Sequence, residues 1–448
     1  MIMLRRPSKK PTYTQLLCCL VSSTGLFSLS YFTSALAQTA GDAQSGNNFN
    51  AGFVPPLQGG TPNFSSPGTV PNTNTMNSQS AAAALKNSNM PASAVSPDEF
   101  QQRLQRIDAM VNRRMAELNI PAYTLAIIRN GKTVFQKPYG LASIQNRQPC
   151  SNDTVFGLAS LTKTFTALTL LSLVDQGLIG LDDPLAKYIP NLTRPYQTLT
   201  IRQLASMSAG VPDKVLQEVA WVDQLDILDH TPLVSAPGSQ FLYSNFSYRL
   251  IGSVIQNVTK RPFLELVRET ILGPLQMHST ATTVMMQGTG RVAQAYGDNM
   301  GNGPLRAIEY KNPAISFSAG MLASTSNDLL NYVYGMMSGK MISPQAYKTL
   351  WYERPALSTG DACPWAFGWH AGPNKSMGGQ YVVAMNGGTP GVASSIIILP
   401  EANSAVIALS NLRKPPVYAI SKAAAAMAFG SGEEAAEPEP TPGSNTED

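Results

Sequence analysis

The chain has 448 residues and a formal net charge of +4, and 13% of its residues are charged, against about a quarter in an average soluble protein. The low share of charged residues and the small net charge argue against a nucleic-acid-binding protein and against a highly charged disordered scaffold. Both ends of the chain differ in composition from the middle, so we consider them separately.

The first 37 residues have the pattern of an export signal. Four cations between residues 5 and 10 precede an uncharged stretch from Leu16 to Leu36, and Ala35-Leu36-Ala37 supplies the small residues of a cleavage site. We therefore expect an exported protein, either periplasmic or secreted. The uncharged stretch is also long enough to cross a bilayer, so an uncleaved signal that anchors the protein in the membrane is the alternative.

Two further segments are too poor in apolar residues to form a core. Residues 38–95 are rich in Asn, Ser, Gly and Pro, and residues 431–448 are rich in Glu and Pro. We expect a disordered linker in the first segment and an acidic disordered tail in the second. Residues 96–430 remain, and they are enough for one large domain or two closely packed ones.

The folded region opens with a predicted helix and hairpin. Pro97–Leu118 has apolar residues at helical spacing, with Arg and Glu between them. Ala122–Arg129 and Thr133–Lys137 flank Asn130-Gly131, the strongest short signal for a β-hairpin. A second helix is predicted over Ala159–Gln176, which a glycine follows.

Helices dominate the middle of the chain and strands return near its end. The predicted helices are Ile201–Ser208, Tyr248–Val258, Phe263–Leu272, Asp328–Ser338 and Val417–Phe429, and the predicted strands are Tyr381–Met385, Ser394–Leu399 and Ala405–Leu409. This order predicts an α/β (α+β) fold. One antiparallel sheet is built from both ends and flanked by terminal helices, and a mostly helical region is inserted from about residue 160 to 360.

Cys150 and Cys363 are the two cysteines that remain after a signal is removed. An even pair in an exported chain favours a Cys150–Cys363 disulfide. The alternative is two buried thiols that act as small hydrophobic side chains.

Several common cofactor sites lack their sequence signals. The three histidines are far apart and have no ligand-like spacing to each other or to cysteine, so we expect no metal site. The chain also lacks a G-x-S-x-G elbow, a phosphate-binding loop and a dinucleotide fingerprint. We therefore expect no cofactor.

Ser160-Leu161-Thr162-Lys163 is the one S-x-x-K motif of the sequence, and it stands at the start of a predicted helix. Residues i and i+3 share a helix face, so the Lys163 amine can approach the Ser160 hydroxyl. A helix N-terminus and apolar neighbours both disfavour an ammonium, which favours a neutral lysine able to take the proton of the serine. The alternative is a helix-capping serine and a solvated lysine.

Further motifs accompany this tetrapeptide in a fixed order over residues 96–430. They are Phe156–Lys163, Gly180–Leu185, Ile201–Leu204, Ser208–Gly210, Pro237-Gly238 with Phe241, Tyr243–Asn245, Pro274-Leu275 with Met277, Ser318–Met321, Phe367–Trp369 and Gly387–Gly391. With them the chain resembles the serine β-lactamase and penicillin-binding protein superfamily, specifically its class C β-lactamase-like branch. That branch includes β-lactamases, D-amino-acid peptidases and carboxypeptidases, and carboxylesterases. The resemblance implies a sheet of five or more antiparallel strands.

The resemblance also implies roles for individual residues. Ser160 is expected as the nucleophile, Lys163 as its base and Tyr243 as a proton relay. Asn245 would hold a substrate amide or the Lys163 amine. The backbone N–H groups of Ser160 and Thr389 would form the oxyanion hole. In the structural alternative, Tyr243 is a core tyrosine and Asn245 a turn residue.

The third motif of the family differs in this chain. Asn386-Gly387-Gly388 stands where Lys-Thr-Gly or His-x-Gly is usual. We expect Asn386 and Gly388 at the substrate, but Asn386 offers hydrogen bonds without a charge. A substrate carboxylate would then depend on another cation, such as Arg413.

Together these features predict an exported serine hydrolase that forms an acyl-enzyme. The expected substrate is a small molecule or peptide, including cell-wall peptides, with an ester or D-amino-acid amide preferred to a β-lactam. The alternative is a weakly active or inactive domain that binds cell-wall peptide or a protein partner. No nucleic-acid partner is expected, membrane contact depends on an uncleaved signal, and the sequence leaves the oligomeric state open.

Overall fold

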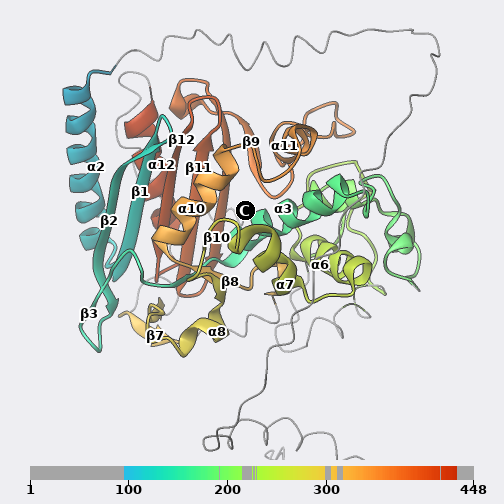
Figure 1. Cartoon of the computed structure of the whole chain (residues 1–448), viewed down its shortest axis with the longest axis horizontal. Coiled ribbons are helices and arrows are strands. Elements are labelled where there is room, and N and C mark those ends of the chain that lie inside the picture. The colour runs from blue at the N-terminus through green and yellow to red at the C-terminus, as the bar shows by residue number, and fades with distance from the viewer. Residues whose placement is uncertain are drawn as a thin grey trace, which may run out of the picture. The chain divides into compact units, whose positions relative to one another are not determined.

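A seven-stranded antiparallel sheet organises the described part of the chain (Figure 1). The computed structural model describes residues 95–430 apart from 191, 214–224, 226–227, 229, 298–303, 310–315 and 414. The expected signal and acidic tail, and all but the last residue of the expected linker, lie outside the described residues.

The sheet has the strand order β3-β2-β1-β12-β11-β10-β9. Its strands are β1 (Ala122–Arg129), β2 (Lys132–Ser143), β3 (Gln148–Pro149), β9 (His370–Pro373), β10 (Tyr381–Thr389), β11 (Val392–Leu399) and β12 (Ser404–Ser410). The N-terminal and C-terminal strands meet where β1 pairs with β12, from Tyr123 opposite Ser410 to Ile128 opposite Ala405. This confirms the predicted antiparallel sheet built from both ends of the folded region.

The β1–β2 turn adopts the backbone conformation that its sequence predicts. Asn130 and Gly131 have φ values of +50° and +73°, and a two-residue hairpin turn that matches the sheet twist requires positive φ at both positions. The hairpin predicted from Asn130-Gly131 is therefore confirmed.

Two helices from opposite ends of the folded region, α2 (Pro97–Glu117) and α12 (Pro415–Phe429), cover one face of the sheet (Figure 1). On β1, Tyr123, Leu125 and Ile127 pack in their core. The residues that alternate with them pack instead with the helices of the inserted region. Both faces of the sheet are therefore buried at β1, because successive side chains of a strand point to opposite faces.

The inserted region is mostly helical, as predicted. It contains η1 (Ala159–Leu161), α3 (Thr162–Asp175), α4 (Ile201–Ala205), α6 (Asn245–Thr259), α7 (Phe263–Val267), η4 (Arg268–Leu272), α8 (Thr283–Gln287), α10 (Ser326–Met337) and α11 (Pro344–Trp351), and the short strands β4 (Phe156–Gly157), β5 (Ala281–Thr282), β6 (Ala295–Gly297), β7 (Arg306–Ile308) and β8 (Leu322–Ser324). α3 is buried along nearly its whole length. Among the described helices, none is both long and apolar enough to span a bilayer.

β10 is longer than the sequence predicts. The pattern indicates a strand over Tyr381–Met385, whereas the strand continues through Asn386 to Thr389. Asn and Gly are disfavoured in strands, but here Asn386 pairs with Ser395 and Gly387 with Ser394 on β11. Pairing with a neighbouring strand therefore overrides the local propensity.

The predicted Cys150–Cys363 disulfide is wrong. Both cysteines are free and buried. The Cys150 sulfur lies near the Tyr123 carbonyl of β1, whereas the Cys363 sulfur lies 3.4 Å from the Ser206 carbonyl after α4. A disulfide needs Cα atoms within about 7 Å, and the even count of cysteines says nothing of that distance. Burial raises the pKa of the Cys150 thiol to about 11, so the alternative of two inert buried thiols holds.

Candidate active site

Ser160 lies in η1, the turn that connects β4 to α3. Ala159, directly before it, has a φ of +45°, a conformation that costs a non-glycine residue about 1–3 kcal/mol. The Leu158 N–H donates to the Leu322 carbonyl of β8 at 2.8 Å and so ties the turn to its neighbour. Backbone strain of this kind persists only where the surrounding structure holds it.

The Lys163 amine is buried beside the Ser160 hydroxyl. Its Nζ lies 3.0 Å from Ser160 Oγ, 2.7 Å from Asn245 Oδ1 and 3.0 Å from the Ala319 carbonyl. The side chain has an exposed fraction of 0%. One turn of α3, the start of α6 and the η5 turn (Phe317–Ala319) therefore meet at one nitrogen atom.

Burial lowers the pKa of Lys163 to about 7, with Asp213 acting against this and Arg249 adding to it. Near neutral pH much of the lysine is thus uncharged. A neutral amine has two N–H groups and one lone pair, and the Asn245 and Ala319 oxygens can only accept. They take the two N–H groups, which leaves the lone pair for the Ser160 hydroxyl.

Tyr243 approaches Ser160 from the other side. Its hydroxyl donates to Ser160 Oγ at 2.8 Å, and burial raises its pKa, so the phenol stays protonated at neutral pH. Met207 holds the residues on either side of Tyr243. Its carbonyl accepts from the Leu242 N–H at 2.8 Å, and its sulfur accepts from the Ser244 N–H at 3.3 Å. Ser160 Oγ consequently lies between a group that can accept its proton and a group that donates one.

Asn245 is the first residue of α6 and is held by a residue that the sequence analysis missed. Its backbone N–H and its Nδ2 each donate to the Asp213 carboxylate at 3.0 Å. Asp213 follows three residues after the Ser208–Gly210 motif. Its place close to that motif could have marked Asp213 as a candidate site residue. Its contact with Asn245 could not be predicted, because the two residues are 32 positions apart in the sequence.

β10 passes close to the Ser160 turn because Gly387 has no side chain. A Cβ at this position would lie 2.0 Å from the Leu158 carbonyl oxygen. Ser394 of β11 donates to the same carbonyl at 2.7 Å. Thr389, the last residue of β10, is exposed two positions further along. The Asn386-Gly387-Gly388 motif and the turn that carries Ser160 are therefore neighbours in space.

Asn386 and Gly388 present different chemistry at this strand. Asn386 Oδ1 is buried and has no hydrogen-bond partner among the residues that the structure describes. A Cβ on Gly388 would lie 3.2 Å from Nε of Arg413. Position 386 thus carries no charge, whereas the exposed Arg413 guanidinium lies beside position 388.

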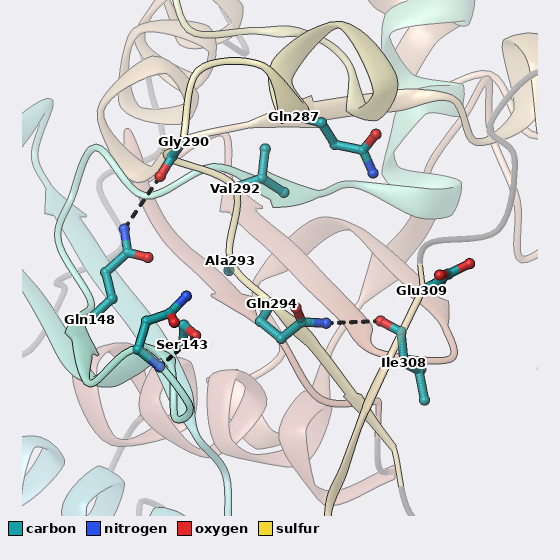
Figure 2. A pocket seen from close by; sticks show the side chains of 10 residues that line it. Ser143, Gln148, Gln287, Gly290, Val292, Ala293, Gln294, Ile308 and Glu309 are labelled. Atoms are coloured by element: carbon teal, nitrogen blue, oxygen red, sulfur yellow. Dashed lines mark hydrogen bonds between the residues drawn. The ribbon is translucent and has the colours of Figure 1, made fainter.

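A separate polar hollow of about 620 Å³ lies between β2, β3, α8 and β7 (Figure 2). Amide and hydroxyl side chains line much of it, and within it Gln294 Nε2 donates to the Ile308 carbonyl at 2.9 Å. Ser160, Lys163, Tyr243 and Asn245 are not among its lining residues. In the described ranges, no cluster of three or more His, Cys, Asp or Glu residues is placed to hold a metal ion.

Residues 107–430 match the model of the family described as Beta-lactamase. The chain belongs to this family, which confirms the resemblance drawn from its motifs. The match covers the whole sheet and the inserted region that carries Ser160 and Lys163.

Two curated relatives illustrate this assignment. Protein flp of Staphylococcus aureus (strain MW2) is 28% identical over 324 residues, which are 69% of this chain and 63% of that protein, so the chain spans less than two thirds of it. Penicillin-binding protein 4* of Bacillus subtilis (strain 168) is 26% identical over 332 residues, 68% of this chain and 72% of the relative.

Two structures show the same fold. An octameric penicillin-binding protein homologue from Pyrococcus abyssi has a TM-score of 0.65 and 24% identity, over 73% of this chain and 77% of that one. FmtA from Staphylococcus aureus has a TM-score of 0.60 and 20% identity, over 70% and 85%.

The low pKa of Lys163 predicts a pH-dependent stability difference between the wild type and Lys163→Met. From about pH 7 to pH 10 the unfolded chain binds a proton at Lys163 that the folded chain does not, so wild-type stability gains from this residue as pH rises. The variant lacks this gain. We expect the unfolding free energy of the variant minus that of the wild type to fall across this range.

Urea unfolding of both proteins at several pH values measures this difference, and the other titrating groups cancel in the subtraction. A difference that does not change with pH would show that the buried amine titrates near its ordinary value.

Proposed function

We propose that this protein is an exported serine hydrolase that forms an acyl-enzyme on Ser160. The proposed substrates are esters and D-amino-acid amides or peptides, including those derived from the cell wall. One observation carries the proposal: Ser160 Oγ lies 3.0 Å from the buried Lys163 amine and 2.8 Å from the protonated Tyr243 hydroxyl. The export part rests on the sequence of residues 1–37 alone.

In the proposed acylation, neutral Lys163 accepts the proton of Ser160 while Oγ forms a bond to the carbonyl carbon of the substrate. The backbone N–H groups of Ser160 and Thr389 donate to the developing oxyanion. The carbonyl then re-forms, the bond to the leaving group breaks, and Tyr243 gives its proton to the departing alkoxide or amine. The proton held by Lys163 replaces the one that Tyr243 gave, by way of the site's hydrogen bonds.

Deacylation uses the same groups in the opposite direction. Water loses a proton to the Lys163–Tyr243 pair as its oxygen attacks the acyl carbon, and Ser160 Oγ regains a proton as the ester bond breaks. The net reaction consumes one water and releases an acid and an alcohol or amine. No cofactor enters this balance.

The charges around Ser160 support the proposed substrate range. Asn386 provides no charge to pair with a carboxylate, which favours neutral esters over β-lactams. Arg413 beside Gly388 offers an exposed guanidinium near the end of β10, so D-amino-acid peptides with a free carboxylate stay within the proposed range.

The first test is covalent labelling of Ser160. We expect a fluorophosphonate to add once to the wild type, with the adduct located on Ser160 by peptide mass spectrometry. Ser160→Ala should lose both the adduct and hydrolysis of short-chain esters, whereas Ser151→Ala, which changes an exposed serine outside the site, should keep both. A folded wild type without an adduct or turnover would support the non-catalytic binding domain instead.

Tyr243→Phe tests the proton relay. The substitution keeps the ring against Trp365, whose centroid lies 5.6 Å away, and removes only the hydroxyl. We expect ester turnover to fall by about 10²–10⁴. Tyr248→Phe is the matched control, because that hydroxyl donates to the Ala205 carbonyl and not to Ser160. If both variants lose equally little activity, Tyr243 is a packing residue.

Asn386→Lys tests the reading of substrate carboxylates. A charge-assisted hydrogen bond exceeds a neutral one by about 1 kcal/mol. The ratio of kcat/KM for a cephalosporin to that for a neutral short-chain ester should therefore rise by about five- to tenfold. Arg413→Gln should lower the same ratio. A ratio that Asn386→Lys leaves unchanged or reduces would show that position 386 does not read the carboxylate.

A further inference from the structure

Asp213 holds Asn245 by two hydrogen bonds at once. Its Oδ1 accepts from the Asn245 backbone N–H and its Oδ2 from the Asn245 side-chain Nδ2, both at 3.0 Å. Asn245 begins α6, where the free N–H groups and the helix dipole favour a carboxylate. The backbone and the side chain of one residue are thus fixed by one anion.

This arrangement determines which way the Asn245 amide faces. A carboxylate only accepts hydrogen bonds, so Nδ2 must face Asp213 and Oδ1 must face Lys163. In the reversed orientation Oδ1 would meet the carboxylate, and Nδ2 would donate to the lone pair of neutral Lys163. The lone pair of Lys163 could then no longer accept a proton from the Ser160 hydroxyl. The orientation seen here leaves it directed at the hydroxyl.

Asp213 also balances the charge around the buried amine. Arg249 of α6 is the cation that acts on Lys163, and it disfavours the ammonium. The nearby Tyr243 and Tyr248 are neutral, since burial raises the pKa of both phenols. The Ser160 and Ala319 groups carry no charge. Among the residues that the structure describes, Asp213 is therefore the anion that offsets burial and Arg249.

We propose that Asp213 is a positioning residue that fixes the Asn245 amide and sets the pH range in which Lys163 can activate Ser160. This inference rests on the proposed function, in which neutral Lys163 accepts the serine proton. Without Asp213, Lys163 stays neutral to lower pH but is a weaker base, and the Asn245 amide is free to reverse.

The experiment measures the rate of fluorophosphonate labelling of Ser160 in the full chain from pH 5 to pH 9. In the wild type, the rate should rise with a midpoint near the Lys163 pKa of about 7. In Asp213→Asn, we expect the midpoint to move down by about 0.5–1 pH unit, a modest change because Asp213 is exposed to water. The plateau rate at high pH should fall about tenfold.

Two controls separate charge from packing. Asp213→Glu keeps the anion, so its midpoint should stay near that of the wild type. Asp98→Asn removes an exposed carboxylate from the first turn of α2 and should change neither midpoint nor plateau. Asp213→Ser replaces Asp213→Asn if the latter does not fold. A lower plateau with an unchanged or raised midpoint would overturn the proposal, since a purely structural role gives that result.

A second measurement does not depend on any reaction. The pH dependence of unfolding, with Lys163→Met as the reference in each background, reports the Lys163 pKa directly. It should be lower in Asp213→Asn than in the wild-type background, and an equal value would also overturn the proposal. If wild-type Ser160 is never labelled, the proposed function fails by itself, and this measurement still decides whether Asp213 acts on Lys163.

Discussion

The removal of the Lys163 amine from water is the constraint on which the rest of the site depends. A buried amine without partners costs several kcal/mol, and here the partners come from η1, α6 and η5. These three segments converge at the first turn of α3, which is buried. The packing of the inserted region and the geometry around Ser160 therefore depend on each other.

The sheet provides the rigid side of this site. β12 pairs with β1 on one side and with β11 on the other, so strands from both ends of the folded region form one antiparallel sheet. On β10, Gly387 allows the strand to approach the Leu158 carbonyl. Backbone N–H groups in a paired strand are held firmly, which suits a group that must stabilise charge without rearranging.

Charge around Ser160 divides into buried and exposed groups, with different consequences. Lys163 and Arg249 are buried, and their environment controls the protonation state of the proposed base. Asp213 and Arg413 are exposed to solvent. Because one fold supports many substrates, we infer that Asn386 and Arg413 bear on what is hydrolysed, whereas Asp213 bears on the pH at which hydrolysis proceeds.

The sequence by itself determined the features that depend on neighbours along the chain. The Asn130-Gly131 hairpin, the order of helices and strands, and the three-residue step from Ser160 to Lys163 follow from local backbone geometry. Only the tertiary structure decided the rest: the separation of Cys150 from Cys363, the extension of β10, and the two hydrogen bonds that Asn245 donates to Asp213. Each depends on a distance between segments far apart in sequence, which composition and periodicity do not encode because they describe one segment at a time.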